Sequence, residues 1–338
     1  MLRFAALVAL AATATVIAGR GMTALAVTET AEHGVARSWP TTCTVSIQVA
    51  GVPTDVEASH SAVWVATGLG GIVRVDPSTN DIVARIRPGG SVTRLARGLG
   101  AVWALDLFGE RLLRIDPRTN RVVQSIAVDP LPSAVEVGHG LVWVASQLAS
   151  TVSGIDPRTG QVVKLARFAR GELWPGALAV GRSGVWVVTA AGNEVSVFDP
   201  GTMTFRHRLA LPGARTLAAA GQEAWVGIAG GTLLRVRNDT IARVALGTRG
   251  DGYGPSLAAG GRIWVGDRSE VVALDPSTGA VVLRARLPRG TDAGPIAGGS
   301  PTRPCRLRGR GGRPARSRRG RRRGRPGRCP PRSRCGGP

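Results

Sequence analysis

Tryptophan recurs along this chain at a nearly constant interval. Six tryptophans are separated by 39, 40, 43, 39 and 39 residues, and they are Trp64, Trp103, Trp143, Trp186, Trp225 and Trp264. Such a period indicates one structural unit copied head to tail, in which neighbouring copies must stack to bury their apolar faces. The repeat therefore constrains the fold more than any local pattern does. It leaves the function open, because repeat scaffolds serve many unrelated tasks.

One repeat contains four short segments of strand-forming sequence. In the second repeat these are 91–96, 101–105, 112–116 and 122–128, which carry β-branched and other apolar residues and are separated by turn residues. The repeats show no helical periodicity. Four strands with tight turns are the content of one propeller blade. We therefore predict an all-β fold, a β-propeller of four-stranded antiparallel blades, with the six tryptophans as its structural repeat core.

The turn between the third and fourth strands has its own signature. An Asp-Pro pair recurs at 76–77, 116–117, 156–157, 199–200 and 275–276. Aspartate can accept a hydrogen bond from the backbone two residues on, and proline presets φ for the turn. We interpret these aspartates as turn-forming residues rather than as catalytic or metal-binding residues.

The two ends of the repeat region indicate how the ring closes. Residues 44–50 match the fourth strand of a blade, and residues 295–300 match the first strand of another. We therefore place the propeller at 44–300 and predict seven intended blades, of which six are complete and the seventh lacks its second and third strands. A six-bladed ring is the alternative.

A family resemblance rests on the segment Arg-Ile-Asp-Pro-Arg-Thr-Asn-Arg-Val-Val-Gln-Ser-Ile at 114–126. This segment resembles the YVTN-type (YncE-like) β-propeller repeat, and the likeness extends over 44–300. Val-Trp-Val or Ala-Trp-Val stands where that family has Tyr-Val. A weaker likeness is to the streptogramin (virginiamycin B) lyase propellers, which share Gly-x-x-Trp repeats. The first resemblance implies an extracytoplasmic propeller that binds or scaffolds without established catalysis.

The first residues read as a targeting segment. A short basic start is followed by an apolar run over 4–18 and by a small-residue cleavage motif, Ala24-Leu25-Ala26. We predict a signal peptide over 1–26, cleaved near Ala26, then a linker over 27–43 and a secreted or extracytoplasmic location. The pairing of Cys43, the one cysteine before the C-terminal region, stays open.

Most of the net charge of +22 lies in the last residues of the chain. Residues 301–338 contain 15 arginines and no acidic residue, whereas 27–300 balance 27 basic against 22 acidic residues. Such a tail cannot bury a core and is predicted to be disordered. Its Arg/Pro/Gly composition favours translation of a wrong reading frame. A solvated tail and a polyanion-binding tail are the alternatives.

Loops that depart from the repeat supply the candidate ligand-binding residues. They are Asp106, Phe108, Glu110, Glu172, Trp174, Asp251, Tyr253, Asp267, Arg268 and Glu270. No nucleophile elbow, phosphate-binding loop or zinc-protease motif occurs, so we predict no catalytic residue, no metal ligand and no cofactor.

These observations favour a non-catalytic binding or scaffold module for an extracytoplasmic envelope protein or glycan. It is expected to be a monomer that recognises no specific nucleic acid. One alternative is a metal-dependent propeller enzyme, similar to streptogramin lyase or to lactonases, with a divalent cation at the propeller axis. A second alternative is a truncated or frameshifted propeller with no intact function.

Overall fold

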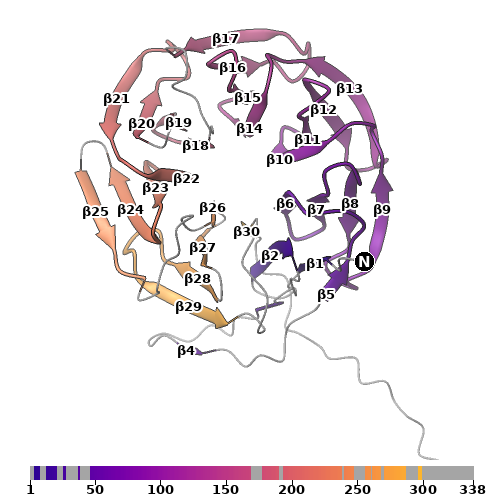
Figure 1. Cartoon of the computed structure of the whole chain (residues 1–338), viewed down its shortest axis with the longest axis horizontal. Coiled ribbons are helices and arrows are strands. Elements are labelled where there is room, and N and C mark those ends of the chain that lie inside the picture. The colour runs from indigo at the N-terminus through magenta and orange to yellow at the C-terminus, as the bar shows by residue number, and fades with distance from the viewer. Residues whose placement is uncertain are drawn as a thin grey trace, which may run out of the picture. The chain divides into compact units, whose positions relative to one another are not determined.

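The six repeats build six successive four-stranded antiparallel sheets that stand as blades around a ring (Figure 1). This computed structural model describes residues 4–7, 13–20, 26–27, 37–38, 46–168, 177–189, 193–237, 240–246, 256–259, 261–267, 270–286 and 296–298. Every regular element in these ranges is a strand, and they contain no helix that could cross a membrane. The predicted all-β propeller is therefore confirmed.

Each blade runs from its innermost to its outermost strand in chain order. Blade 1 comprises β6 (Asp55–Ala58), β7 (Val63–Ala66), β8 (Ile72–Val75) and β9 (Ile82–Ile86). Blade 2 comprises β10 (Val92–Gly98), β11 (Ala101–Asp106), β12 (Arg111–Asp116) and β13 (Arg121–Ala127). Blade 3 comprises β14 (Pro132–Gly138), β15 (Leu141–Ser146), β16 (Thr151–Ile155) and β17 (Val162–Arg167). Blade 4 comprises β18 (Ala177–Gly181), β19 (Gly184–Val188), β20 (Glu194–Phe198) and β21 (Phe205–Ala210). Blade 5 comprises β22 (Ala214–Ala220), β23 (Glu223–Ile228), β24 (Thr232–Arg237) and β25 (Thr240–Val244). Blade 6 comprises β26 (Ser256–Ala259), β27 (Ile263–Asp267), β28 (Glu270–Leu274) and β29 (Val281–Arg286).

The periodic tryptophans lie on the second strand of each blade, and each is at most 1% exposed. Trp64 of blade 1 packs in an apolar cluster with Val102 and Ile115 of blade 2. Trp143 of blade 3 packs against blade 4, where its ring meets Phe198 edge to face at 5.8 Å. The indoles therefore join neighbouring blades, which is the contact that a repeat protein depends on.

An arginine on the third strand strengthens three of these junctions. The guanidinium of Arg74 lies 5.2 Å from the centroid of the Trp64 ring and donates to the carbonyl of Pro117 in the next blade at 2.7 Å. Arg114 makes the same contacts with Trp103 and with the carbonyl of Pro157. Arg235 repeats them with Trp225 and the carbonyl of Ser277, which lie in blades 5 and 6. Each arginine thus holds the Asp-Pro turn of the following blade against its own tryptophan.

The Asp-Pro turns have the predicted hydrogen bonds. The Oδ1 atom of Asp116 accepts from the backbone N–H of Arg118 at 2.8 Å, two residues on. The equivalent bonds at Asp156 and Asp275 are 2.7 and 2.8 Å long. Asn120 closes its turn at φ +57°, a conformation that asparagine tolerates. These hydrogen bonds explain why aspartate recurs at this turn in the absence of a catalytic or metal-binding role.

A further sheet is not built from a repeat. Its strand order is β30 (Ile296–Gly298), β2 (Thr13–Arg20), β1 (Phe4–Leu7) and β5 (Ser46–Gln48), with β3 (Ala26–Val27) also paired to β2. The segments predicted as first and fourth strands of an incomplete blade therefore share one sheet, and strands from the predicted signal peptide lie between them. Within the described residues the repeats form six blades, and the predicted seventh blade is not shown.

Two short features complete the description. β4 (Arg37–Ser38), within the predicted linker, pairs in parallel with β29. The chain divides into two units, Met1–Cys305 and Arg306–Pro338, and the second lies outside the described residues, as does Cys43.

Candidate functional site

Asp106, the first of the predicted ligand-binding residues, is fully buried. Its Oδ2 atom accepts from Nε of Arg111 at 2.8 Å, and its Oδ1 atom accepts from the backbone N–H groups of Ser91 and Gly109. Burial would raise the pKa of Asp106, but these hydrogen bonds and the Arg111 charge outweigh it and lower the pKa. The structure thus shows Asp106 holding its own loop to the start of blade 2.

The other predicted residues are spread over several blades. In the loop after β11, Phe108 is 74% exposed and Glu110 is exposed at φ +47°. Glu270 accepts from Nη1 of Arg284 at 2.8 Å. Asp267 ends β27, but its side chain is outside the description. Glu172, Trp174, Asp251, Tyr253 and Arg268 also lie outside the described residues, so no set of these candidates is seen to converge.

A different group of residues departs from the repeat at the centre of the ring. The innermost strands β6, β10, β14, β18, β22 and β26 surround the central axis (Figure 1). On each of them one residue lies directly opposite the periodic tryptophan. In four blades this residue is alanine, namely Ala96, Ala179, Ala218 and Ala258. In blades 1 and 3 it is glutamate, Glu57 and Glu136.

The substitution of glutamate for alanine places acid where the scaffold needs only a small side chain. Glu57 and Glu136, which we term the glutamate pair, are partly buried and surrounded by neighbouring strands. Burial is the largest effect on the Glu57 carboxyl and, with the nearby charges of Glu136 and Asp55, it raises the pKa of Glu57 well above its ordinary value. Burial and the charge of Asp55 raise the pKa of Glu136 to about 8. Like charges gathered in one desolvated place favour the neutral acid.

Asp55 belongs to the same group but is held by the backbone. Its Oδ2 atom accepts from the N–H of Leu95 in blade 2 at 2.8 Å, and its Oδ1 atom accepts from the N–H of Val56 at 2.9 Å. Leu95 follows an irregularity in the register of β10 between Val92 and Arg94, which turns its N–H toward blade 1. Burial nevertheless raises the pKa of Asp55. Asp55 thus joins two blades and adds negative charge beside the glutamate pair.

Basic side chains are fewer here. The charge of Arg97 lowers the pKa of Glu57 in part, and that of Arg94 does so for Asp55. No ion pair joins either arginine to these carboxylates within the described part of the chain. The glutamate pair is therefore able to hold a proton near neutral pH or to accept an added positive charge.

Neither glutamate was among the residues predicted from loop irregularity. The available signal lay inside the strands, seven residues before Trp64 and Trp143, where repeats 2, 4 and 5 place alanine. Among the described residues no group of three or more histidine, cysteine, aspartate or glutamate side chains has the geometry of a metal site.

Comparison with known proteins identifies the architecture only. No protein-family model and no curated protein sequence matches the chain. Among solved structures, the β-propeller domain of Cps50 (Swd1) from Myceliophteria thermophila superposes with a TM-score of 0.57 at 11% identity, covering 75% of this chain and 92% of its own. Hydrazine synthase from Kuenenia stuttgartiensis superposes with a TM-score of 0.56 at 14% identity, covering 67% of this chain and 77% of its own. At such low identity these likenesses, together with the six blades, establish that the chain is a β-propeller.

Proposed function

We propose that this propeller is an extracytoplasmic binding module of the YVTN type, and that the glutamate pair recognises a positively charged group of its ligand. The observation that supports this is the replacement of alanine by glutamate in two of six equivalent positions, both on innermost strands of the ring. Of the predicted envelope ligands, a basic protein segment suits the site better than a neutral glycan, because only the former brings positive charge to two acids. The proposed function is binding without catalysis.

A buried carboxyl group with a raised pKa lowers the free energy of unfolding near neutral pH. Its presence therefore supports a role in ligand binding rather than in stability. Because Glu136 has a folded pKa of about 8 against an ordinary 4.5, the folded chain keeps a proton that the unfolded chain releases. Stability contributed by this group is therefore lost progressively as pH rises from about 4.5 to about 8. Residues that reduce stability in this way are typical of functional sites.

The first test returns each glutamate to the residue of the other blades. Glu57→Ala and Glu136→Ala are expected to keep the fold, since alanine already occupies this position in four blades. A tetralysine peptide, titrated calorimetrically at pH 8.5 in moderate salt, should bind the parent chain, and each variant should bind it about tenfold more weakly. Asp81→Ala, which removes an exposed acid from an outer turn of blade 1, is the matched control and should bind like the parent. Equal binding by parent and both variants would exclude the glutamate pair as the site.

The pH dependence provides a separate prediction. Affinity for the peptide should rise between pH 6.5 and 9, because Glu136 loses its proton in that interval and gains negative charge.

Over the same range of pH, the Glu136→Ala variant should become more stable than the parent. The full pKa shift of Glu136, at about 1.4 kcal/mol per pH unit, sets an upper limit of roughly 5 kcal/mol. We expect a gain on the order of 2 kcal/mol at pH 8, because the Glu136 side chain is only partly buried. Urea unfolding at pH 5.5 and pH 8 measures it, and a difference that does not grow with pH would contradict the assignment.

The extracytoplasmic location has its own test. If residues 1–26 are a signal peptide, the exported protein should begin near Val27, as N-terminal sequencing of the secreted or envelope fraction would show. A protein that retains Phe4–Arg20 would contradict the predicted cleavage, and it would agree instead with the pairing of β1 and β2 to β5 and β30.

A further inference from the structure

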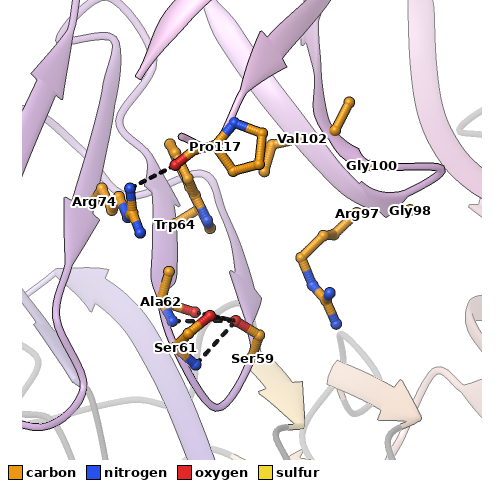
Figure 2. A pocket seen from close by; sticks show the side chains of 11 residues that line it. Ser59, Ser61, Ala62, Trp64, Arg74, Arg97, Gly98, Gly100, Val102 and Pro117 are labelled. Atoms are coloured by element: carbon orange, nitrogen blue, oxygen red, sulfur yellow. Dashed lines mark hydrogen bonds between the residues drawn. The ribbon is translucent and has the colours of Figure 1, made fainter. Parts of the chain in front are cut away.

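A small pocket lies at the junction of blades 1 and 2, the junction that Glu57 also faces. Its volume is about 180 Å³. One side is apolar and comes from Trp64, Val102 and Pro117, whereas Ala62 lies beside the serines (Figure 2). Ser59 and Ser61 lie together, and the Arg97 side chain extends opposite them (Figure 2).

This pocket exists because two residues at the junction depart from the repeat. At the next two junctions a valine of the following blade packs directly on a glycine of the preceding one. A Cβ atom on Gly98 would lie 2.5 Å from Cγ1 of Val137, and one on Gly138 would lie 2.4 Å from Cγ1 of Val180. At the first junction the glycine position is Ser59 and the valine position is Arg97. A long polar side chain therefore stands where an apolar contact seals the other junctions.

The polar groups of the pocket are available to a ligand. Arg97 is exposed, and its guanidinium makes no hydrogen bond or ion pair in the part of the chain that the structure describes. The Ser59 hydroxyl donates to the carbonyl of Ala62 at 3.0 Å, whereas the Ser61 hydroxyl lies 3.5 Å from that of Ser59 and can turn outward. The deeper cation, Arg74, is already bound to Pro117 and Asn120. Arg97 and Ser61 thus offer N–H and O–H donors beside an apolar wall.

We propose that this pocket binds a small organic carboxylate, with the carboxylate on Arg97 and Ser61 and a short apolar body against Ala62, Val102 and Pro117. A guanidinium matches a carboxylate through paired N–H donors. The volume is below the range of roughly 300–1,000 Å³ found for drug-sized ligands, so the ligand is small or is one side chain of a larger molecule. The charge of the ligand is opposite to that expected at the glutamate pair, so an anionic and a cationic probe distinguish the two sites.

Glu57, which faces the same junction, does not remove the positive charge of Arg97. The two side chains form no ion pair. The raised pKa of Glu57 favours its neutral form when the site is empty. A bound carboxylate therefore meets an arginine that is not already neutralised.

Calorimetric titration of the full chain with isobutyrate, at pH 7 in 0.15 M NaCl, tests the proposal. We expect saturable binding at one site per chain. Arg97→Val restores the residue of blades 3 and 4, fills the pocket and should weaken binding about tenfold or more, whereas Arg97→Lys keeps the charge and should weaken it less. Arg121→Gln removes an exposed arginine from the outermost strand of the same blade and should bind like the parent.

Competing anions decide the ligand class. Acetate, which lacks the apolar body, should bind more weakly than isobutyrate, and inorganic phosphate should not displace isobutyrate at equal concentration. The proposal fails if the parent shows no saturable binding, if Arg97→Val binds within about twofold of the parent while keeping its melting temperature, or if phosphate binds in preference. Binding by the arginine-rich tail would survive Arg97→Val and would thereby also overturn the assignment.

Discussion

Trp143→Ala is expected to unfold the protein or to leave it aggregated. The side chain is fully buried, its Nε1 donates to the carbonyl of Gly138 at 3.0 Å, and its ring lies against Phe198 of the next blade. Truncating a buried tryptophan costs about 3–5 kcal/mol, because apolar burial is lost and a cavity remains between the blades. Most domains have a total stability of only about 5–15 kcal/mol, so this loss removes much of the margin.

Far-UV circular dichroism and thermal unfolding of soluble material measure this outcome. Trp143→Phe, which keeps a large ring but loses the indole N–H, should retain the fold with a lower melting temperature. A soluble Trp143→Ala protein with the melting transition of the parent would contradict the assignment of the periodic indoles as the contact between blades.

Asp106→Ala should have the second-largest effect, and the effect should be on stability rather than on ligand binding alone. Removal of the carboxylate leaves the buried N–H of Ser91 without its acceptor and Arg111 without its ion pair. Removing this buried carboxylate is expected to lower the free energy of unfolding by about 2–3 kcal/mol. This loss is at the lower end of those found for buried ion pairs, because Arg111 remains partly in contact with solvent. Its lowered pKa means that Asp106 stabilises the fold above its ordinary pKa of 3.8, and that this contribution is lost as pH falls further toward the folded value.

Phe108→Ala provides the contrast within the same loop. Phe108 is 74% exposed, so its removal should change the free energy of unfolding by less than about 0.5 kcal/mol. Urea unfolding of both variants at pH 7 compares the two. If Asp106→Ala were as stable as the parent, the loop would not depend on its carboxylate, and a ligand-binding role for Asp106 would regain support.

The loops were harder to interpret from sequence than the strands, because loop positions have no fixed packing task. Of the loop residues that break the repeat, Asp106 is buried and hydrogen-bonded within its loop, and Glu270 accepts a hydrogen bond from Arg284; their role in ligand binding stays a prediction. The departures at Glu57, Glu136 and Arg97 lie within strands and were not predicted from sequence. Such departures can be recognised, because a position with a fixed packing task in most blades has an expected size and polarity.

Sequence periodicity alone determined the blade, its four strands, the turn made by each Asp-Pro pair and the burial of the indoles, because each of these depends on contacts within one repeat or with its immediate neighbour. The tertiary structure decided which residues of different repeats come close to one another. Burial raises the pKa values of Glu57, Asp55 and Glu136, from blades 1 and 3, and nearby acids raise those of the two glutamates further. The placement of Arg97 and Ser59 at one junction leaves a pocket between blades 1 and 2. Such encounters depend on the curvature of the ring, which is the sum of small rotations between blades and is not encoded at any single position of the repeat.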